Sequence, residues 1–322
     1  MLTVEEARKK LRGVVVPLTT IFDSDGTLDL EATASNVQWI VDQGARQGNT
    51  IFLAAGSGGD FTVMSTQERK QVIKAVVDVS KGRIPVMAGV QSTDIRVTIE
   101  LCRYCEQIGV DLAQISHAYY YDCHPEDVIA WHQQVANQTN MSLAPYSHWY
   151  SGSKYDLPLD LVDRLLDIPT AVAVKWGAPS VASFQQGVIR FRERVAVIEN
   201  MLQPILGHVL GCRAWISHVP NFSPQHSWMV WELMESGRYE EAQTEYDRFM
   251  TPYFDLVGRI SAKTAGEGVF VRPGLEAAGL RSGTSRLPSR DEAGTPELRE
   301  SFHKLLEDAR SRAEATVDRA ER

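Results

Sequence analysis

Up to about residue 224, short apolar runs alternate with longer amphipathic stretches, a pattern typical of βα units in a parallel sheet. Each apolar run has the length of a buried strand and is bounded by polar or turn-forming residues. The eight predicted strands are Val14–Leu18, Ile51–Ala55, Pro85–Ala88, Leu112–Ile115, Met141–Pro145, Ala171–Val174, Val195–Ile198 and Ala214–Ile216.

Segments with helical spacing separate these runs, and each is long enough to cross back over a sheet. The expected helices include Leu30–Val41, Gln67–Val79, Val97–Ile108, Pro125–Val135, Leu159–Leu166 and a shorter one over Leu202–Val209. Eight strands with intervening helices predict a closed (β/α)8 barrel, the TIM barrel of the α/β class.

After Pro224 only helical periodicity remains. It predicts helices over Trp228–Ser236, Tyr239–Val257, Val269–Ala278 and Leu298–Arg322, with a loop over Arg281–Pro296. The sequence therefore predicts two parts, a barrel over residues 1–224 and a helical extension over residues 225–322 packed on it.

Charge and composition narrow the classes of function. The net charge of −8 and the scattering of Lys and Arg among acidic residues leave no basic stripe for nucleic acid. No stretch approaches the roughly 18 apolar residues of a membrane span, and the charged N-terminus lacks a secretory signal. We expect a cytoplasmic protein with no nucleic-acid or membrane partner.

Lys175 follows directly after the apolar run Ala171–Val174. In (β/α)8 enzymes the working residues stand at the carboxyl ends of the strands. A lysine at a strand end faces either the water at the rim or the barrel mouth. In the mouth it loses hydration, which lowers the pKa of an amine and leaves neutral amine to attack a ketone. The resulting imine is an electron sink.

Imine chemistry needs a proton carrier and donors for the substrate carboxylate. Tyr146 and Ser57 suit the first need. The turn Gly56–Gly59 suits the second, because small side chains let backbone N–H groups converge on an anion. The alternative for this turn is an ordinary tight βα connection.

Aromatic and imidazole groups near the strand ends suit a second substrate. Trp149 and Trp176 offer flat apolar walls, and His117 and His148 offer acid–base or hydrogen-bonding groups. The alternative is that each is a structural residue of the rim.

These residues together resemble the class I pyruvate aldolases of the dihydrodipicolinate synthase and N-acetylneuraminate lyase family, of which the chain looks like a divergent member. The similarity covers nearly the whole chain. The family's G-[ST]-T-G-E, P-Y-Y, Y-N-x-P and G-[IV]-K-[ED] segments are matched by Gly56–Asp60, Ala118–Tyr120, Pro145–His148 and Val174–Trp176.

The resemblance implies a role for several residues. Lys175 would form the Schiff base, Tyr146 would handle protons, and Ser57 would bind the carboxylate and relay protons. Tyr120 would reach a neighbouring subunit's site in a homodimer or homotetramer, and Ile216 would line the 2-oxo acid pocket. Gly56 and Gly58 would belong to the carboxylate-binding turn.

Three positions depart from the family pattern. Gly58 replaces the usual threonine and removes a hydroxyl, Asp60 replaces a glutamate, and Trp176 replaces an acid. Ser147–Lys154 also lacks the arginine of members that condense pyruvate with aspartate semialdehyde, which argues against dihydrodipicolinate synthesis.

The favoured hypothesis is a Schiff-base lyase or aldolase acting on pyruvate or a pyruvate-derived 2-oxo acid, with an aldehyde as the second molecule. The alternatives are a 2-oxo acid dehydratase of the same family and a catalytically impaired ligand-binding barrel. Lys175 and Tyr146 together favour activity, whereas Gly58 favours impairment. We expect no cofactor and no metal, because imine chemistry needs neither and no H-E-x-x-H spacing occurs.

Overall fold

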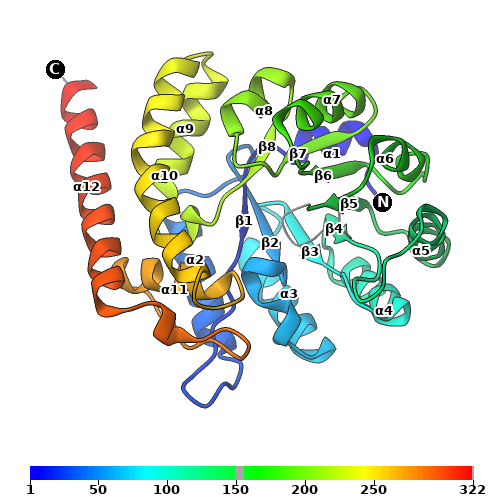
Figure 1. Cartoon of the computed structure of the whole chain (residues 1–322), viewed down its shortest axis with the longest axis horizontal. Helices are drawn as coiled ribbons and strands as arrows, with labels where there is room; N and C mark the ends of the chain where they lie inside the picture. The colour runs from blue at the N-terminus through cyan, green and yellow to red at the C-terminus, as the bar shows by residue number, and fades with distance from the viewer. Residues whose placement is uncertain (149–155, 321–322) are drawn as a thin grey trace. The chain divides into compact units, whose positions relative to one another are not determined.

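Eight parallel strands close into a barrel in chain order, which confirms the predicted α/β architecture (Figure 1). The computed structural model describes residues 1–148 and 156–320. The strands are β1 Gly13–Pro17, β2 Thr50–Ala54, β3 Val86–Gly89, β4 Leu112–Ile115, β5 Leu143–Ser147, β6 Ala173–Trp176, β7 Ala196–Glu199 and β8 Ala214–Ile216.

Contacts along the chain group it into two compact units, which we describe separately. Unit 1 comprises residues 1–17, 45–56 and 64–217 and contains the whole barrel. Unit 2 comprises residues 18–44, 57–63 and 218–322. Each unit is therefore assembled from three separate segments of the sequence.

In unit 1, helices follow the strands around the outside of the barrel (Figure 1). Local sequence sets their ends: Ser65 and Glu68 form a capping box at the start of α3, and Gly109 ends α4 in the left-handed conformation. These helices are α3 Thr66–Ser80, α4 Ile95–Ile108, α5 Pro125–Gln138, α6 Leu159–Leu165, α7 Val181–Phe191 and α8 Pro204–Leu210.

One further helix, α1 (Val4–Lys10), lies against the beginnings of the strands. Ala7 and Leu11 join the apolar cluster of the barrel interior. The backbone N–H of Leu2 donates a hydrogen bond to Ser142 Oγ, just before β5. The Arg8 side chain donates one to the Arg192 carbonyl, shortly before β7. Helix α1 therefore closes the amino end of the barrel.

Alternation along the strands fills that interior with apolar side chains. The interior cluster includes Val15, Ile51, Leu53, Met87, Leu112, Ala144, Ala173, Ala196, Ile198, Ala214 and Ile216. Side chains two residues apart along a strand point the same way. Gln114, Tyr146 and Lys175 each lie two residues after an inward-facing residue, so they also face inward.

Strands β5 and β6 run two residues further than the apolar pattern predicts. The apolar runs begin in the buried connections at Met141 and Ala171, before the regular ladder starts. The ladder then continues to Ser147 and Trp176, with Tyr146 opposite Lys175. Tyr146 and Lys175 thus lie within strands and do not merely follow them.

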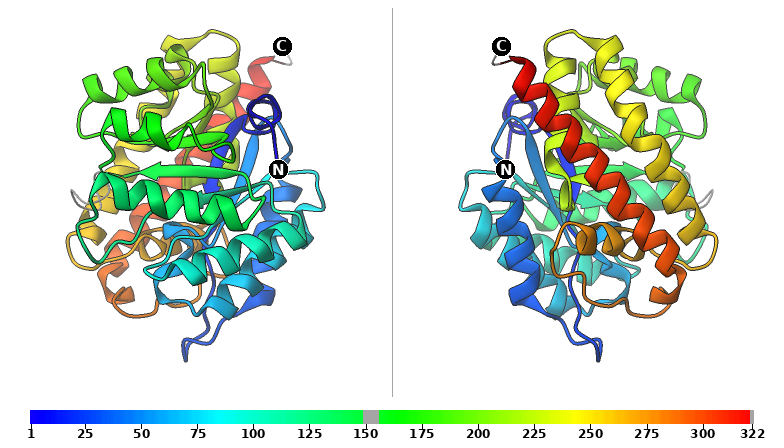
Figure 2. Two further views of the ribbon diagram at one scale, coloured as in Figure 1. Left: turned by 90° about the vertical axis from the view of Figure 1, so that its right-hand side faces the viewer. Right: turned by 90° about the vertical axis from the view of Figure 1, so that its left-hand side faces the viewer.

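Unit 2 consists mainly of helices. Helix α10 packs along α9 and α12 (Figure 2), and Phe222, Phe249, Tyr253 and Phe302 form an aromatic cluster among them. The helices are α2 Leu30–Asp42, η1 Ser57–Gly59, η2 Phe61–Val63, η5 Val219–Asn221, α9 Pro224–Glu235, α10 Tyr239–Ser261, α11 Gly268–Ala277, η6 Asp291–Ala293 and α12 Pro296–Ala320.

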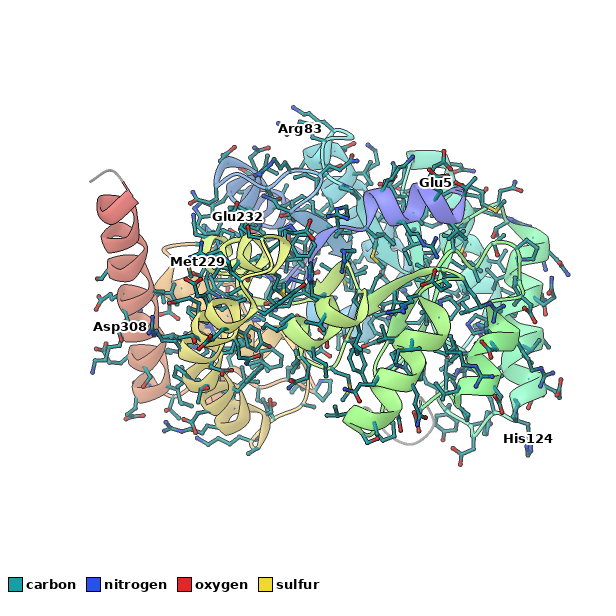
Figure 3. The ribbon with its side chains drawn as sticks, turned by 90° about the horizontal axis from the view of Figure 1, so that it is seen from above. Glu5, Arg83, His124, Met229, Glu232 and Asp308 are labelled. Carbon is teal, nitrogen blue, oxygen red and sulfur yellow. The ribbon has the colours of Figure 1, made fainter. Side chains whose placement is uncertain are left out.

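Polar side chains cover the outside of unit 1. Figure 3 shows the exposed Glu5, Arg83 and His124 projecting from its periphery. Within the described residues, no helix combines the length and the apolar content needed to cross a bilayer.

Candidate active site

Lys175 points into the barrel from β6. It lies two residues after the inward-facing Ala173, and only 4% of its surface is exposed. Its Nζ lies 4.0 Å from the ring centroid of Tyr146 and 3.1 Å from Gln114 Oε1. An aromatic face and an amide oxygen are both good neighbours for a buried ammonium group. The amine is thus held at the top of an apolar interior.

Tyr146 comes from the neighbouring strand and is 2% exposed. Because Tyr146 and Lys175 are register partners, sheet geometry alone brings the ring against the amine. His148, two residues further on, stacks on the Tyr146 ring with centroids 4.1 Å apart and planes at 26°. The three side chains form one group on β5, on β6 and just past the end of β5.

His148 is held neutral by its surroundings. Burial lowers its pKa to about 3, helped by the positive charge of Lys175 and by His117. At neutral pH its imidazole can therefore donate one hydrogen bond and accept another, but it brings no positive charge.

Gln114 and His117 lie on and just after β4, next to β5, whereas Ile216 lies on β8, across the barrel. Gln114 is fully buried on β4 in phase with Leu112, and Ile216 belongs to the interior cluster on β8. His117, just past the end of β4, is 2% exposed. The sequence interpretation missed Gln114. A polar residue at an inward position of an apolar strand was the available signal.

The turn after β2 is bracketed by two residues with left-handed backbone, Ala55 with φ 50° and Asp60 with φ 59°. Gly56 ends this stretch of unit 1, and Ser57, Gly58 and Gly59 form the 3-10 helix η1 of unit 2. Non-glycine residues rarely adopt this conformation, so surrounding contacts must hold the turn in shape.

Asp60 supplies such contacts within unit 2. Its Oδ2 lies 3.0 Å from Arg272 Nη2, and both side chains are buried. Burial raises the pKa of Asp60 to about 6, although Arg272 and the Gly268 N–H favour the carboxylate. A Cβ on Gly268 would come within 2.2 Å of the Asp60 carboxylate, so only glycine lets α11 approach this closely.

Trp176 does not join Lys175. Consecutive strand residues face opposite sides, so the Trp176 ring packs on the outside of β6 against Phe191, and its Nε1 donates to the Phe184 carbonyl at 3.2 Å. A Cβ on Gly187 would lie 2.4 Å from this ring. We therefore assign Trp176 no contact with substrate.

The two remaining residues of the predicted site are Trp149 and Tyr120. Trp149 lies outside the described residues. Tyr120 is 73% exposed beyond β4, with its ring edge-to-face with Tyr121 at 5.1 Å. An exposed pair of tyrosines suits a contact with another subunit.

Glu199 is a buried carboxyl on the outer side of β7, in register with Trp176 and Trp215. Its Oε1 accepts hydrogen bonds from the backbone N–H groups of Met201 and Gln203. Burial raises its pKa to about 7. Its place outside the sheet marks it as a structural carboxyl that ties down the turn before α8.

Known proteins resemble this chain over most of its length. The chain is 29% identical to an uncharacterized DapA-like lyase of Halobacterium salinarum, over 72% of this chain and 75% of that protein. It is 26% identical to Escherichia coli YagE, described provisionally as a 2-dehydro-3-deoxy-D-gluconate aldolase, over 76% of this chain and 84% of YagE.

Solved structures share the fold. That of N-acetylneuraminate lyase from Mycoplasma synoviae superposes with a TM-score of 0.79 at 18% identity, covering 92% of this chain and 97% of that one. The model of the Dihydrodipicolinate synthetase family matches residues 10–309. With nearly the whole sequence matched, the chain belongs to the dihydrodipicolinate synthetase family.

Proposed function

We propose that this protein is a class I lyase that forms a Schiff base between Lys175 and pyruvate or a pyruvate-derived 2-oxo acid. The observation that carries the proposal is the placement of Lys175 Nζ, buried in the barrel and 4.0 Å from the Tyr146 ring. Burial costs the charged ammonium more than the neutral amine, which is the nucleophile.

In the proposed reaction, the amine adds to C2 of the 2-oxo acid and the C2 oxygen leaves as water. The protonated imine then draws electrons from the C3–C4 bond. Cleavage releases an aldehyde and leaves an enamine of pyruvate, and the reverse sequence makes an aldol. Tyr146 is the proposed proton carrier, because its phenol belongs to the ring that faces the amine.

Other residues are proposed to bind the ends of the substrate. Ser57, with the N–H groups of the Gly56 and Gly58 turn, would hold the carboxylate, because this turn directly follows β2 in the chain and working residues of (β/α)8 enzymes follow their strands. Ile216 would contact the methyl or methylene group. The neutral His148 would hydrogen-bond the aldehyde oxygen, and Trp149 stays a sequence-based proposal for the same subsite.

Tyr120 is proposed to contact a second copy of the chain in a homodimer or homotetramer. Its support is the exposure of its ring and its place just past β4, the strand that carries Gln114. A partner's tyrosine could then approach the site from outside the barrel.

The test is covalent trapping. The protein is incubated with pyruvate and sodium borohydride, its intact mass is measured, and the adduct is located by peptide mapping. We expect one reduced pyruvyl group on Lys175, no adduct in Lys175→Ala, and an unchanged adduct in Lys74→Ala, whose lysine is exposed on α3.

Absence of an adduct in folded wild-type protein would overturn the imine mechanism. Once an adduct is found, candidate 2-oxo acids separate the lyase from a dehydratase. Carbon–carbon cleavage yields pyruvate and an aldehyde, whereas dehydration yields water and keeps the carbon skeleton whole. A barrel that forms the adduct but turns over none of the 2-oxo acids tested would match the impaired binder.

A further inference from the structure

Gln114 is a polar residue that faces the barrel interior beside Lys175, above the apolar cluster that fills the rest of that interior. It is 0% exposed and lies in phase with Leu112 of the interior cluster. Transferring an amide from water into such surroundings is unfavourable unless its hydrogen bonds are replaced. A leucine would fit this position without that cost, so the amide needs a reason to be there.

Of the two polar atoms of the Gln114 amide, only the oxygen has a hydrogen-bond partner among the described residues. Gln114 Oε1 accepts a hydrogen bond from Lys175 Nζ at 3.1 Å. Gln114 Nε2, equally buried, has no hydrogen-bond partner among the described residues. Buried donors are rarely left unpaired in folded proteins. A donor left open beside the reactive amine indicates that a ligand atom completes it.

We propose that Gln114 is a catalytic residue that binds both atoms of the reacting centre, its Oε1 accepting from Nζ–H and its Nε2 donating to the oxygen on C2 of the 2-oxo acid. This proposal rests on the proposed Schiff-base function. It adds a residue that the resemblance to known aldolases did not point to and that the sequence pattern missed.

The chemistry gives the amide two successive tasks. Nζ forms a bond to C2 while the carbonyl π electrons move to the oxygen, which takes a proton to give a carbinolamine. The C2–O bond then breaks with a second proton, water leaves, and the nitrogen lone pair forms the iminium. Overall, one ammonium and one ketone give one protonated imine and one water.

The amide matches the carbinolamine in shape. Its oxygen and nitrogen share one carbon, as do the nitrogen and oxygen of the carbinolamine, so the two pairs have similar separations. Two parallel hydrogen bonds can therefore form, N–H to Oε1 and Nε2–H to the leaving oxygen. After water leaves, the iminium N–H still donates to Oε1, which keeps the electron sink protonated.

Two substitutions with opposite expected effects on the protonation of Lys175 test the proposed role of Gln114. Gln114→Leu removes the acceptor from the ammonium, and Gln114→Glu places an anion there. Thr98→Val is the matched control, because Thr98 Oγ1 is also buried without a partner but belongs to α4 on the outside of the barrel. The readouts are borohydride trapping with pyruvate as a function of pH and deuterium exchange of the pyruvate methyl group.

Gln114→Leu should shift the acid limb of trapping to lower pH, because an ammonium without its acceptor loses its proton more easily. Gln114→Glu should shift it to higher pH. Methyl exchange in Gln114→Leu should fall by about tenfold to hundredfold through kcat, the usual weight of a hydrogen bond to a charged group. Thr98→Val should change neither.

Wild-type protein with an adduct on Lys175, together with Gln114 variants that keep the wild-type pH limb and exchange rate, would overturn this role and leave the Schiff-base function standing. Wild-type protein without an adduct would overturn both. Gln114→Glu has the shape of the native residue, so its opposite shift still decides the matter if Gln114→Leu fails to fold.

Discussion

Arg272 Nη2 lies 3.0 Å from Asp60 Oδ2, in a pair of which neither side chain is more than 8% exposed. Arg272 also donates to the Thr20 carbonyl at 3.2 Å and to Ser285 Oγ at 3.0 Å. One guanidinium thus fixes the end of the Ser57–Gly59 turn to two other segments of unit 2.

Replacement of this arginine should be costly. Arg272→Met removes the cationic partner of the buried Asp60 carboxylate and the donor to the Thr20 carbonyl, so the free energy of unfolding should fall by about 3–5 kcal/mol. Urea denaturation measures the loss. The double variant Asp60→Asn with Arg272→Met should lose less than the sum of the single variants, and strict additivity would contradict a coupled pair.

Tyr146→Phe separates binding of the amine from proton transfer. The ring that faces Lys175 is kept and only the hydroxyl is lost. We expect borohydride trapping to persist while methyl exchange of pyruvate slows by about 10²–10⁴-fold, the contribution of a positioned proton carrier. Tyr121→Phe, at an exposed position, is the control. Equal exchange rates in both variants would remove Tyr146 from the proposed mechanism.

Glu199 should make stability depend on pH. Its pKa is about 7 in the fold, above the ordinary 4.5, so the native state holds this proton more tightly than the unfolded chain. The free energy of unfolding should therefore fall as pH rises through this window, by about 3 kcal/mol in all.

Glu199→Gln provides the comparison, because glutamine keeps an acceptor for Met201 and Gln203 but cannot ionise. Urea midpoints at about pH 5 and about pH 8 should show the variant gaining stability relative to wild type at the higher pH. A constant difference between the two proteins would show that Glu199 titrates normally.

Gly187→Ala tests the packing of the outer layer. The new methyl group would lie 2.4 Å from the Trp176 indole, so α7 must move. We expect a loss of about 1–3 kcal/mol in the free energy of unfolding despite the better helix propensity of alanine. Gly258→Ala, in α10 with nothing within 4 Å, should instead gain up to about 1 kcal/mol. Similar effects of the two would contradict the contact.

Tyr120→Asp tests the proposed subunit contact. A charge at a ring that packs against another subunit would be buried without a partner, so sedimentation should show smaller assemblies than wild type. Glu126→Gln, at another exposed site, should leave the assembly unchanged. An unaltered sedimentation pattern in Tyr120→Asp would place the interface elsewhere.

The barrel was predictable because its strands are buried on both faces and read as apolar runs. Strands β4 and β8 match their predicted bounds residue for residue. The sequence pattern gives no bounds for helices α1 and α7. Helix α1 is short and mostly charged, and α7 carries Gly187 and a run of small and polar residues that weakens its helical pattern.

The site is harder to predict than the fold, because the polar residues of the site lie in the strand ends that extend beyond the apolar runs. The register that sets Tyr146 against Lys175 becomes visible only once β5 and β6 extend beyond their apolar segments. Because β6 extends to Trp176, the alternation that points Lys175 inward turns Trp176 outward, whereas the sequence predicts Trp176 as a pocket wall. The sequence pattern does not single out Gln114, because one amide within the apolar strand β4 only interrupts the apolar run and carries no further signal.

The position of helix α1 bears on how a small molecule can approach Lys175. Because Ala7 and Leu11 pack against the apolar interior at the amino end, we expect small molecules to reach and leave Lys175 through the carboxyl end. In the proposed cleavage, the covalent bond to Lys175 sets the order in which the products leave. The aldehyde has to escape before the pyruvate fragment, which stays covalently attached until water reaches it by the same route. Product inhibition should accordingly be of the ordered type, with pyruvate competing directly against the incoming 2-oxo acid.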